Sequence, residues 1–118
     1  MPAIGKNILQ ARKALGWSQE ELAQRMGYKS RSSIHKIETD QNDIPQHKIV
    51  EFARVLGTTP ATLMGLVDEE TRAKTDVIAG VVVRMRSDPH FREAVMLLYE
   101  EEDEERLGKM IEVLRLLQ

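Results

Sequence analysis

The hydrophobic pattern of the first 65 residues predicts five short helices. Apolar residues recur at helical spacing, and most of the stretches end at a glycine, where a left-handed C-terminal cap costs little, or at polar residues. The fourth helix is expected to turn Ile49, Val50, Ala53 and Leu56 inward. The expected helices span residues 4–15, 19–26, 31–38, 46–56 and 61–64.

The second helix has the strongest start signal. Ser18 is placed to accept a hydrogen bond from the Glu21 amide while Glu21 reaches back to the Ser18 amide, and Trp17 is placed to pack on Leu22. This combination of capping box and hydrophobic staple predicts a helix that begins at Gln19.

The third helix, which Ser30 is placed to cap, has a narrow apolar stripe. Ile34 and Ile37 are its inward residues. On a helical wheel the opposite side is polar, and Arg31 lies on the flank near the N-terminal end. The polar side chains therefore face something other than the core: Ser32, His35 and Lys36.

Residues 68–118 also predict helices. The spacing of Val77, Ile78, Val81, Val82 and Met85 is helical, although the β-branched run at 81–83 leaves a strand as an alternative. Asp88-Pro89 is typical of a helix start, and the helix that follows carries Phe91, Val95 and Leu98. A last helix over about 102–117 has one apolar stripe, formed by Leu107, Met110, Ile111, Leu114 and Leu117.

Composition changes the picture mainly through charge. The 118 residues carry a formal net charge of -2, which by itself argues against a nucleic-acid partner. Residues 1–67 hold nine Lys and Arg against six Asp and Glu, whereas residues 68–118 hold eight against thirteen. This split favours a mildly basic domain, 1–67, followed by an acidic segment, 68–118.

Several function classes are not expected. The chain has no cysteine, no zinc-binding His-Glu-x-x-His, no phosphate loop and no plausible set of nucleophile, base and orienting residue, so neither an enzyme nor a metal or cofactor site is expected. The acidic run 100–105 lacks the ligand spacing and glycine of a calcium loop and is better explained as a solvated helix start. With no signal peptide and no membrane span, the expected location is the cytoplasm.

The second and third helices together predict a helix-turn-helix, in which the second helix of the motif enters the DNA major groove. A groove about 12 Å wide admits one helix, so its outer side chains must form hydrogen bonds with base edges. The candidate base contacts are Arg31, Ser32, His35 and Lys36. Gln19, at the start of the preceding helix, is a candidate phosphate contact.

Three segments carry a resemblance to a known family: Trp-Ser-Gln-Glu-Glu-Leu-Ala from Trp17, Ser-Arg-Ser-Ser-Ile-His-Lys-Ile-Glu from Ser30, and Asp-Ile-Pro from Asp43. Together they resemble the Cro and phage-repressor type (lambda-repressor-like, XRE) helix-turn-helix family over about 4–65. The resemblance implies a five-helix DNA-binding domain that regulates transcription, most often as a repressor, with prophage regulators as the most similar subgroup.

The same resemblance implies roles for individual residues. The positions that match Gln19 contact the DNA backbone, and those that match Arg31, Ser32 and Lys36 reach bases. Arg12 and Glu38 match an internal ion pair that joins the first helix to the third. The turn before the third helix is one residue longer than is usual, at Lys29.

Other polar residues near the third helix are candidates for phosphate contact, with plain solvent exposure as the alternative: Lys29, Ser30, Asn42, His47 and Lys48. Tyr28 belongs either to the core or to the phosphate-contacting set, and His35 either contacts DNA or stands beside it. The run Val77-Ile78-Ala79-Gly80 resembles the cleavage site of self-cleaving repressors, but the residues after Gly80 are too few for a peptidase domain.

The sequence therefore predicts an all-α transcription regulator with a DNA-binding domain at 1–67 and a helical oligomerisation segment at 68–118. The stripe of the last helix predicts a homodimer that binds double-stranded DNA at a palindromic operator, with a tail folded back on its own domain as the alternative. A rival hypothesis is an antitoxin whose acidic C-terminal segment binds a basic protein partner, and a third is a purely structural helical bundle.

Overall fold

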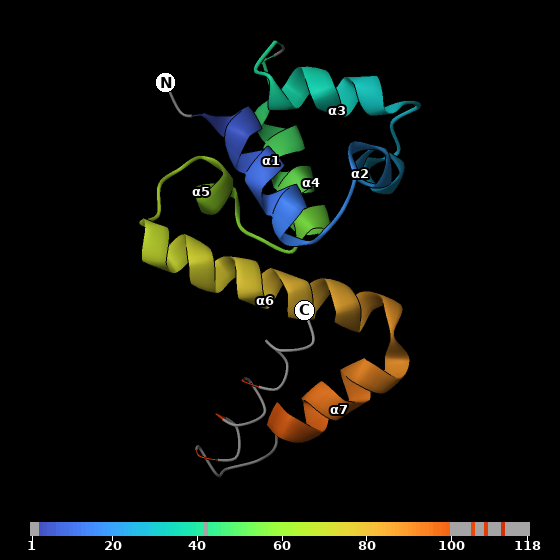
Figure 1. The fold of residues 1–118 in the computed structure, drawn as a ribbon, viewed down its shortest axis with the longest axis vertical. Helices are drawn as coiled ribbons and strands as arrows, with labels where there is room; N and C mark the ends of the chain where they lie inside the picture. Colours follow the sequence, from blue (N-terminus) through green and yellow to red (C-terminus); the bar gives the residue numbers. More distant parts are fainter. Residues whose placement is uncertain (1–2, 42, 100–104, 106–107, 109–111, 113–118) are drawn as a thin grey trace.

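The computed structural model describes residues 3–41, 43–99, 105, 108 and 112 (Figure 1). This part of the chain contains helices with defined bounds and no β-strand, which confirms the all-α prediction. The helices are α1 (Ile4–Ala14), α2 (Gln19–Met26), α3 (Arg31–Glu38), α4 (Gln46–Leu56), α5 (Pro60–Leu63), α6 (Glu69–Ser87) and α7 (Pro89–Tyr99). The alternative of a strand at 81–83 is wrong, because these residues lie within α6.

Local signals set the ends of the short helices. Ser18 Oγ accepts a hydrogen bond of 3.0 Å from the Glu21 amide at the start of α2, and Gly27 ends that helix with φ of 79°. The Glu21 carboxylate accepts a hydrogen bond from Arg25 Nε (2.9 Å). The reciprocal half of the predicted capping box was therefore wrong, since the carboxylate bonds one turn further along its own helix.

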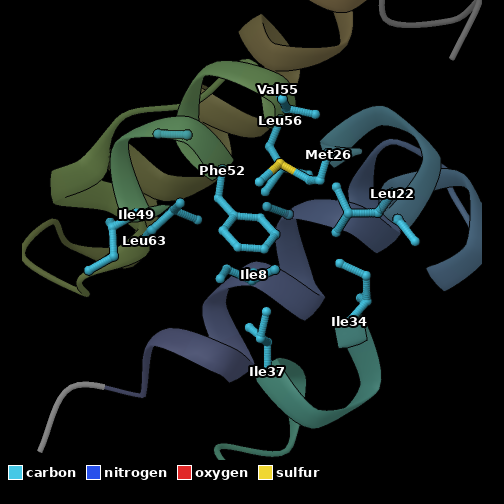
Figure 2. Packing of buried hydrophobic residues seen from close by; sticks show 13 residues of the cluster. Ile8, Leu22, Met26, Ile34, Ile37, Ile49, Phe52, Val55, Leu56 and Leu63 are labelled. Atoms are coloured by element: carbon cyan, nitrogen blue, oxygen red, sulfur yellow. The ribbon is translucent and has the colours of Figure 1, made fainter. Parts of the chain in front are cut away.

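A single apolar core joins α1–α5 (Figure 2). Phe52 lies at its centre, fully buried among the side chains of Ile8 and Leu63. The prediction that Val50 points inward was wrong, because this side chain is 52% exposed. On the α4 wheel Phe52 and Val50 lie on opposite sides of Ile49, and α1 and α2 pack against the side that carries Phe52.

The first turn of α1 crosses the C-terminal end of α3 at very short range. A Cβ atom on Gly5 would lie 2.2 Å from the carbonyl oxygen of Ile37, so only glycine fits this position. The Gly5 amide donates a hydrogen bond of 3.1 Å to Asp40 Oδ1, and Asp40 has φ of 57°. The turn after α3 thus supplies a partner for one of the free amides at the start of α1.

Helix α6 packs against the five-helix domain on the side opposite α3 (Figure 1). Ala79 and Val83 are its buried residues, and Gly57 lets α6 approach closely, because a Cβ atom there would lie 3.0 Å from the Ala79 carbonyl oxygen. The stripe that predicts this helix is not its buried side, and Ile78 in that stripe is 58% exposed. The smaller Ala79 permits the close contact that a β-branched residue would prevent.

Helix α7 folds back along α6. Asp88 Oδ1 accepts a hydrogen bond of 3.1 Å from the Phe91 amide, as the Asp-Pro start signal predicts, and the Arg84 guanidinium lies 4.2 Å from the centre of the Phe91 ring. None of the helices in the described ranges is both long and apolar enough to span a membrane. The apolar stripe of the predicted last helix lies outside the described residues: Leu107, Met110, Ile111, Leu114 and Leu117.

Candidate nucleic-acid interface

Helix α3 presents a polar side away from the core. Ile34 is fully buried and Ile37 is 9% exposed, and both belong to the core that holds the helix against α1 and α2. The candidate base contacts Arg31, Ser32, His35 and Lys36 are all exposed. Packing of α3 through one apolar stripe therefore leaves these four side chains free to meet a ligand.

A buried ion pair fixes α3 to α1. Arg12 Nε lies 2.6 Å from Glu38 Oε2, and Arg12 Nη2 donates a second hydrogen bond of 3.0 Å to Oε1. The third donor, Nη1, bonds the Trp17 carbonyl oxygen at 2.7 Å, just before α2. The structure thus contains the Arg12–Glu38 pair that the family resemblance implies, and the guanidinium joins α1, α3 and the start of α2.

Gln19 belongs to the same network. Its Nε2 donates a hydrogen bond of 2.9 Å to Glu38 Oε1, an interaction that the sequence did not predict. A carboxamide has two N–H donors and an acceptor oxygen, so this bond orients the group and leaves further capacity for a phosphate. Gln19 lines a shallow hollow together with Arg31, Ser32 and His35, which places the start of α2 beside the polar side of α3.

The turn before α3 forms a second hollow, lined by Lys29, Ser30 and Arg31 together with the acidic Glu20. Ser30 is the N-cap residue of α3, but the predicted side-chain cap is not formed. The Ser33 amide bonds the Ser30 carbonyl oxygen instead (3.3 Å), and Ser30 Oγ pairs with Ser32 Oγ at 2.6 Å. The backbone thus already supplies a partner for the Ser33 amide, and the Ser30 and Ser32 hydroxyls remain at the surface.

The start of α4 completes the surface. Lys36, His47 and Lys48 line a third hollow, which also includes Ser33 and the acidic Asp43. Sequence reasoning missed Ser33, although its place on the flank of the α3 wheel beside Lys36 is a signal that could have found it. The hollow therefore joins the C-terminal part of α3 to the first turn of α4.

Lys48 is held by two neighbours. Its Nζ lies 3.2 Å from Glu51 Oε2 and 5.2 Å from the centre of the Tyr28 ring. The hydrogen bond to Glu51 raises the pKa of the Lys48 amine above its ordinary value, so the amine carries its positive charge at neutral pH. Tyr28 is half-buried with its ring 6.3 Å from that of Phe52, so it belongs to the edge of the core.

The three hollows form one continuous surface, because Arg31 lines the first two and Tyr28 lines the second and third. Every described residue that the sequence predicts to contact DNA lies on it: Gln19, Lys29, Ser30, Arg31, Ser32, His35, Lys36, His47 and Lys48. Asn42 lies outside the described residues. Within the described ranges, no group of three or more His, Asp or Glu side chains could hold a metal ion.

Comparison with known proteins identifies the domain that carries this surface. A family model described as Helix-turn-helix matches residues 8–63, a range that runs from within α1 to the end of α5. No curated protein and no solved structure matches the chain. The match covers the ion pair, both helices of the motif and the start of α4. Residues 8–63 are therefore a helix-turn-helix domain of the XRE, lambda-repressor-like type, which supports a role as a DNA-binding transcription regulator.

Proposed function

We propose that this regulator is a prophage-type repressor that binds a palindromic operator as a homodimer. The observation that carries the proposal is the continuous surface around α3. It brings side chains suited to base contact and to phosphate contact together on one side of a helix whose other side packs on the core. Helix α3 enters the major groove. Base edges are read by Arg31, Ser32, His35 and Lys36.

The side chains have the donors that each role needs. Arg31 and Lys36 donate to the O6 and N7 acceptors of guanine, while the Ser32 hydroxyl both donates and accepts. Lys29, His47 and Lys48 flank them and contact phosphates, as does Ser30 through its exposed hydroxyl. Gln19 contacts a phosphate with its second N–H, supported by the free amides in the first turn of α2.

Dimerisation is assigned to the C-terminal segment, 68–118. Large apolar side chains are exposed on α6 and α7, where Ile78 is 58%, Met96 51% and Leu97 65% exposed. These helices lie at the other end of the molecule from α3 (Figure 1), so a partner there leaves the DNA-reading surface open. A two-fold dimer presents two copies of α3 to successive half-sites of a palindrome.

Selection of bound sequences from a random DNA pool tests the palindrome directly. A two-fold symmetric consensus is expected, with half-sites about one helical turn apart. A consensus without symmetry would contradict the dimeric mode of binding. Light scattering at micromolar concentration should give the mass of two chains, and a single-chain mass would contradict the assignment to the C-terminal segment.

Lys36→Ala tests the position of α3 on the selected site. If Lys36 reads a base, the variant should lose about 1–3 kcal/mol of binding free energy and its preference at one base pair, measured by fluorescence anisotropy. Lys74→Ala is the matched control, because Lys74 lies on α6 with its side chain 70% exposed. Uniform weakening across sequences would instead make Lys36 a phosphate contact, and unchanged affinity would remove it from the interface.

A further inference from the structure

A second concave surface lies away from α3, where the end of α1, the turn that follows it and the last turn of α2 meet α6 and α7. It has a volume of about 450 Å³ and is lined by residues of all these elements. Its apolar part includes Leu15, Trp17, Val81 and Phe91. None of these residues belongs to the surface around α3, so the hollow is a separate feature of the molecule.

The charged side chains that line this hollow are all cations. They are Lys13, Arg25 and Arg84, and no Asp or Glu lies among the described residues that line it. Glu21, which is outside the lining, pairs with Arg25 at 2.9 Å. Lys13 and Arg84 form no ion pair with any carboxylate of the described residues. The described residues therefore leave two positive charges at the hollow uncompensated.

The two arginines lie against aromatic rings. The Arg25 guanidinium is 4.0 Å from the centre of the Trp17 ring, and Arg84 is 4.2 Å from that of Phe91. A guanidinium stacked on a ring loses less conformational freedom when it binds an anion, because the ring already restricts it. The hollow therefore combines apolar walls with cations that are partly fixed in place.

We propose that this hollow binds a small amphipathic anion, an apolar body with one carboxylate or phosphate head, which acts as an effector of the DNA-binding domain. The volume lies within the range of sites for small ligands, roughly 300–1,000 Å³. The apolar body would contact Trp17, Val81 and Phe91, and the head group would meet Lys13 and Arg84. A neutral ligand would leave these cations without a partner.

The effector role rests on the proposed DNA-binding function and on one chain of hydrogen bonds. The Trp17 carbonyl oxygen accepts from Arg12 Nη1, and Arg12 holds Glu38 at the end of α3. Glu38 in turn orients Gln19. A ligand that displaces Trp17 therefore acts through Arg12 on Glu38, the residue that positions Gln19. If the ligand changes the affinity for DNA by some factor, linkage requires that DNA change the affinity for the ligand by the same factor.

Trp17 is the single tryptophan, so its fluorescence reports on the hollow without DNA. Titration of the full chain with octanoate or monooctyl phosphate should shift its emission saturably, and 1-octanol should bind about threefold to tenfold more weakly because it lacks the charge. Arg84→Gln should weaken the anions by a similar factor and leave octanol unchanged, whereas the control Lys74→Gln should alter neither. No saturable shift, or equal binding of octanol, would overturn the site.

The same proteins test the effector role. Saturating octanoate should change the affinity of the wild-type chain for its selected operator at least about threefold, and Arg84→Gln should lose this response. Unchanged DNA affinity with a saturated hollow would overturn the effector role. If the free chain binds no DNA while Trp17 still reports binding, the proposed repressor function fails and the ligand site stands.

Discussion

The five-helix domain and the two helices that follow it are stabilised by different means. Helices α1–α5 share a core of thirteen buried apolar residues, whereas the buried residues of α6 are Ala79 and Val83. Helix α6 instead carries ion pairs on its own surface, in which Arg72 contacts both Glu69 and Asp76 and Lys74 contacts Glu70. Exposed pairs such as Lys74–Glu70 contribute little to stability, about 0.3–0.5 kcal/mol each.

The difference shows which parts of the molecule are fixed and which depend on a partner. The α3 surface is backed by a complete core and a buried ion pair, so its geometry exists before DNA arrives. Helices α6 and α7 leave large apolar side chains exposed, which favours a further contact through this end. We therefore expect variants in the five-helix domain to change the stability of the protein more than variants of α6 do.

Arg12→Ala should give the largest effect. It leaves the Glu38 carboxylate buried without its partner and should lower the free energy of unfolding by about 3–5 kcal/mol, measured by urea denaturation. Arg12→Met combined with Glu38→Met should recover most of this loss, because no charge then remains buried. Arg25→Ala, which breaks an exposed pair, is the control and should cost less than about 1 kcal/mol. An equal cost for Arg12→Ala and Arg25→Ala would contradict the role given to burial.

Gly57→Ala should give an intermediate effect that measures the contact between the two regions. Gly57 and Gly27 both have positive φ, 70° and 79°, so each alanine variant should lose about 1 kcal/mol from backbone strain. Only at Gly57 does the new Cβ also meet a backbone, at 3.0 Å from the Ala79 carbonyl oxygen. The loss at Gly57 should therefore be larger, with faster amide exchange in α6. Equal losses for the two variants would mean that α6 does not pack at Gly57.

Lowering the pH should give the smallest effect, confined to the start of α6. Hydrogen bonds from Thr71 lower the pKa of Asp68, and a hydrogen bond from Arg72 lowers that of Glu69. Because both folded-state values lie below the ordinary ones, the stabilisation is present above the ordinary pKa and is lost as the pH falls through the lowered value. Burial raises the pKa of Asp76, which opposes this loss.

NMR chemical shifts of α6 provide the measurement for this pH effect. The first turn should lose helical shifts below about pH 4, and Asp68→Asn should flatten the response of the Thr71 amide. Residues of α3 serve as an internal control, since their shifts should not follow the Asp68 titration. A Thr71 amide that titrates identically in the wild type and in Asp68→Asn would contradict the assigned cap.

Local chemistry made the helices and one surface predictable. Ser18, Gly27 and Gly57 mark helix ends because capping needs particular side chains or a left-handed backbone, whatever lies nearby. The exposed side of α3 followed from its two inward isoleucines. These features depend on neighbours within a few residues, which the sequence displays directly.

Other features depended on packing between distant segments. Val50 and Phe52 are both apolar residues of α4, and only the arrangement of α1 and α2 decides that Phe52 is at the centre of the core. In α6, the small Ala79 is buried and Ile78 is exposed because Gly57 permits a close approach. Hydrophobicity alone would bury Ile78 before Ala79 and does not separate Val50 from Phe52, since it contains no information on the distance between two backbones.

By itself, then, the sequence determined the helical elements, the helix-turn-helix motif and the residues that face away from the core. The tertiary structure decided how these residues meet: it gathered Gln19, the turn and the start of α4 around α3, and it bonded Gln19 to Glu38. It also created the hollow beside Trp17, which no sequence motif indicates. The physical reason is that helix periodicity assigns a side chain to a face, whereas a site requires several faces to come together.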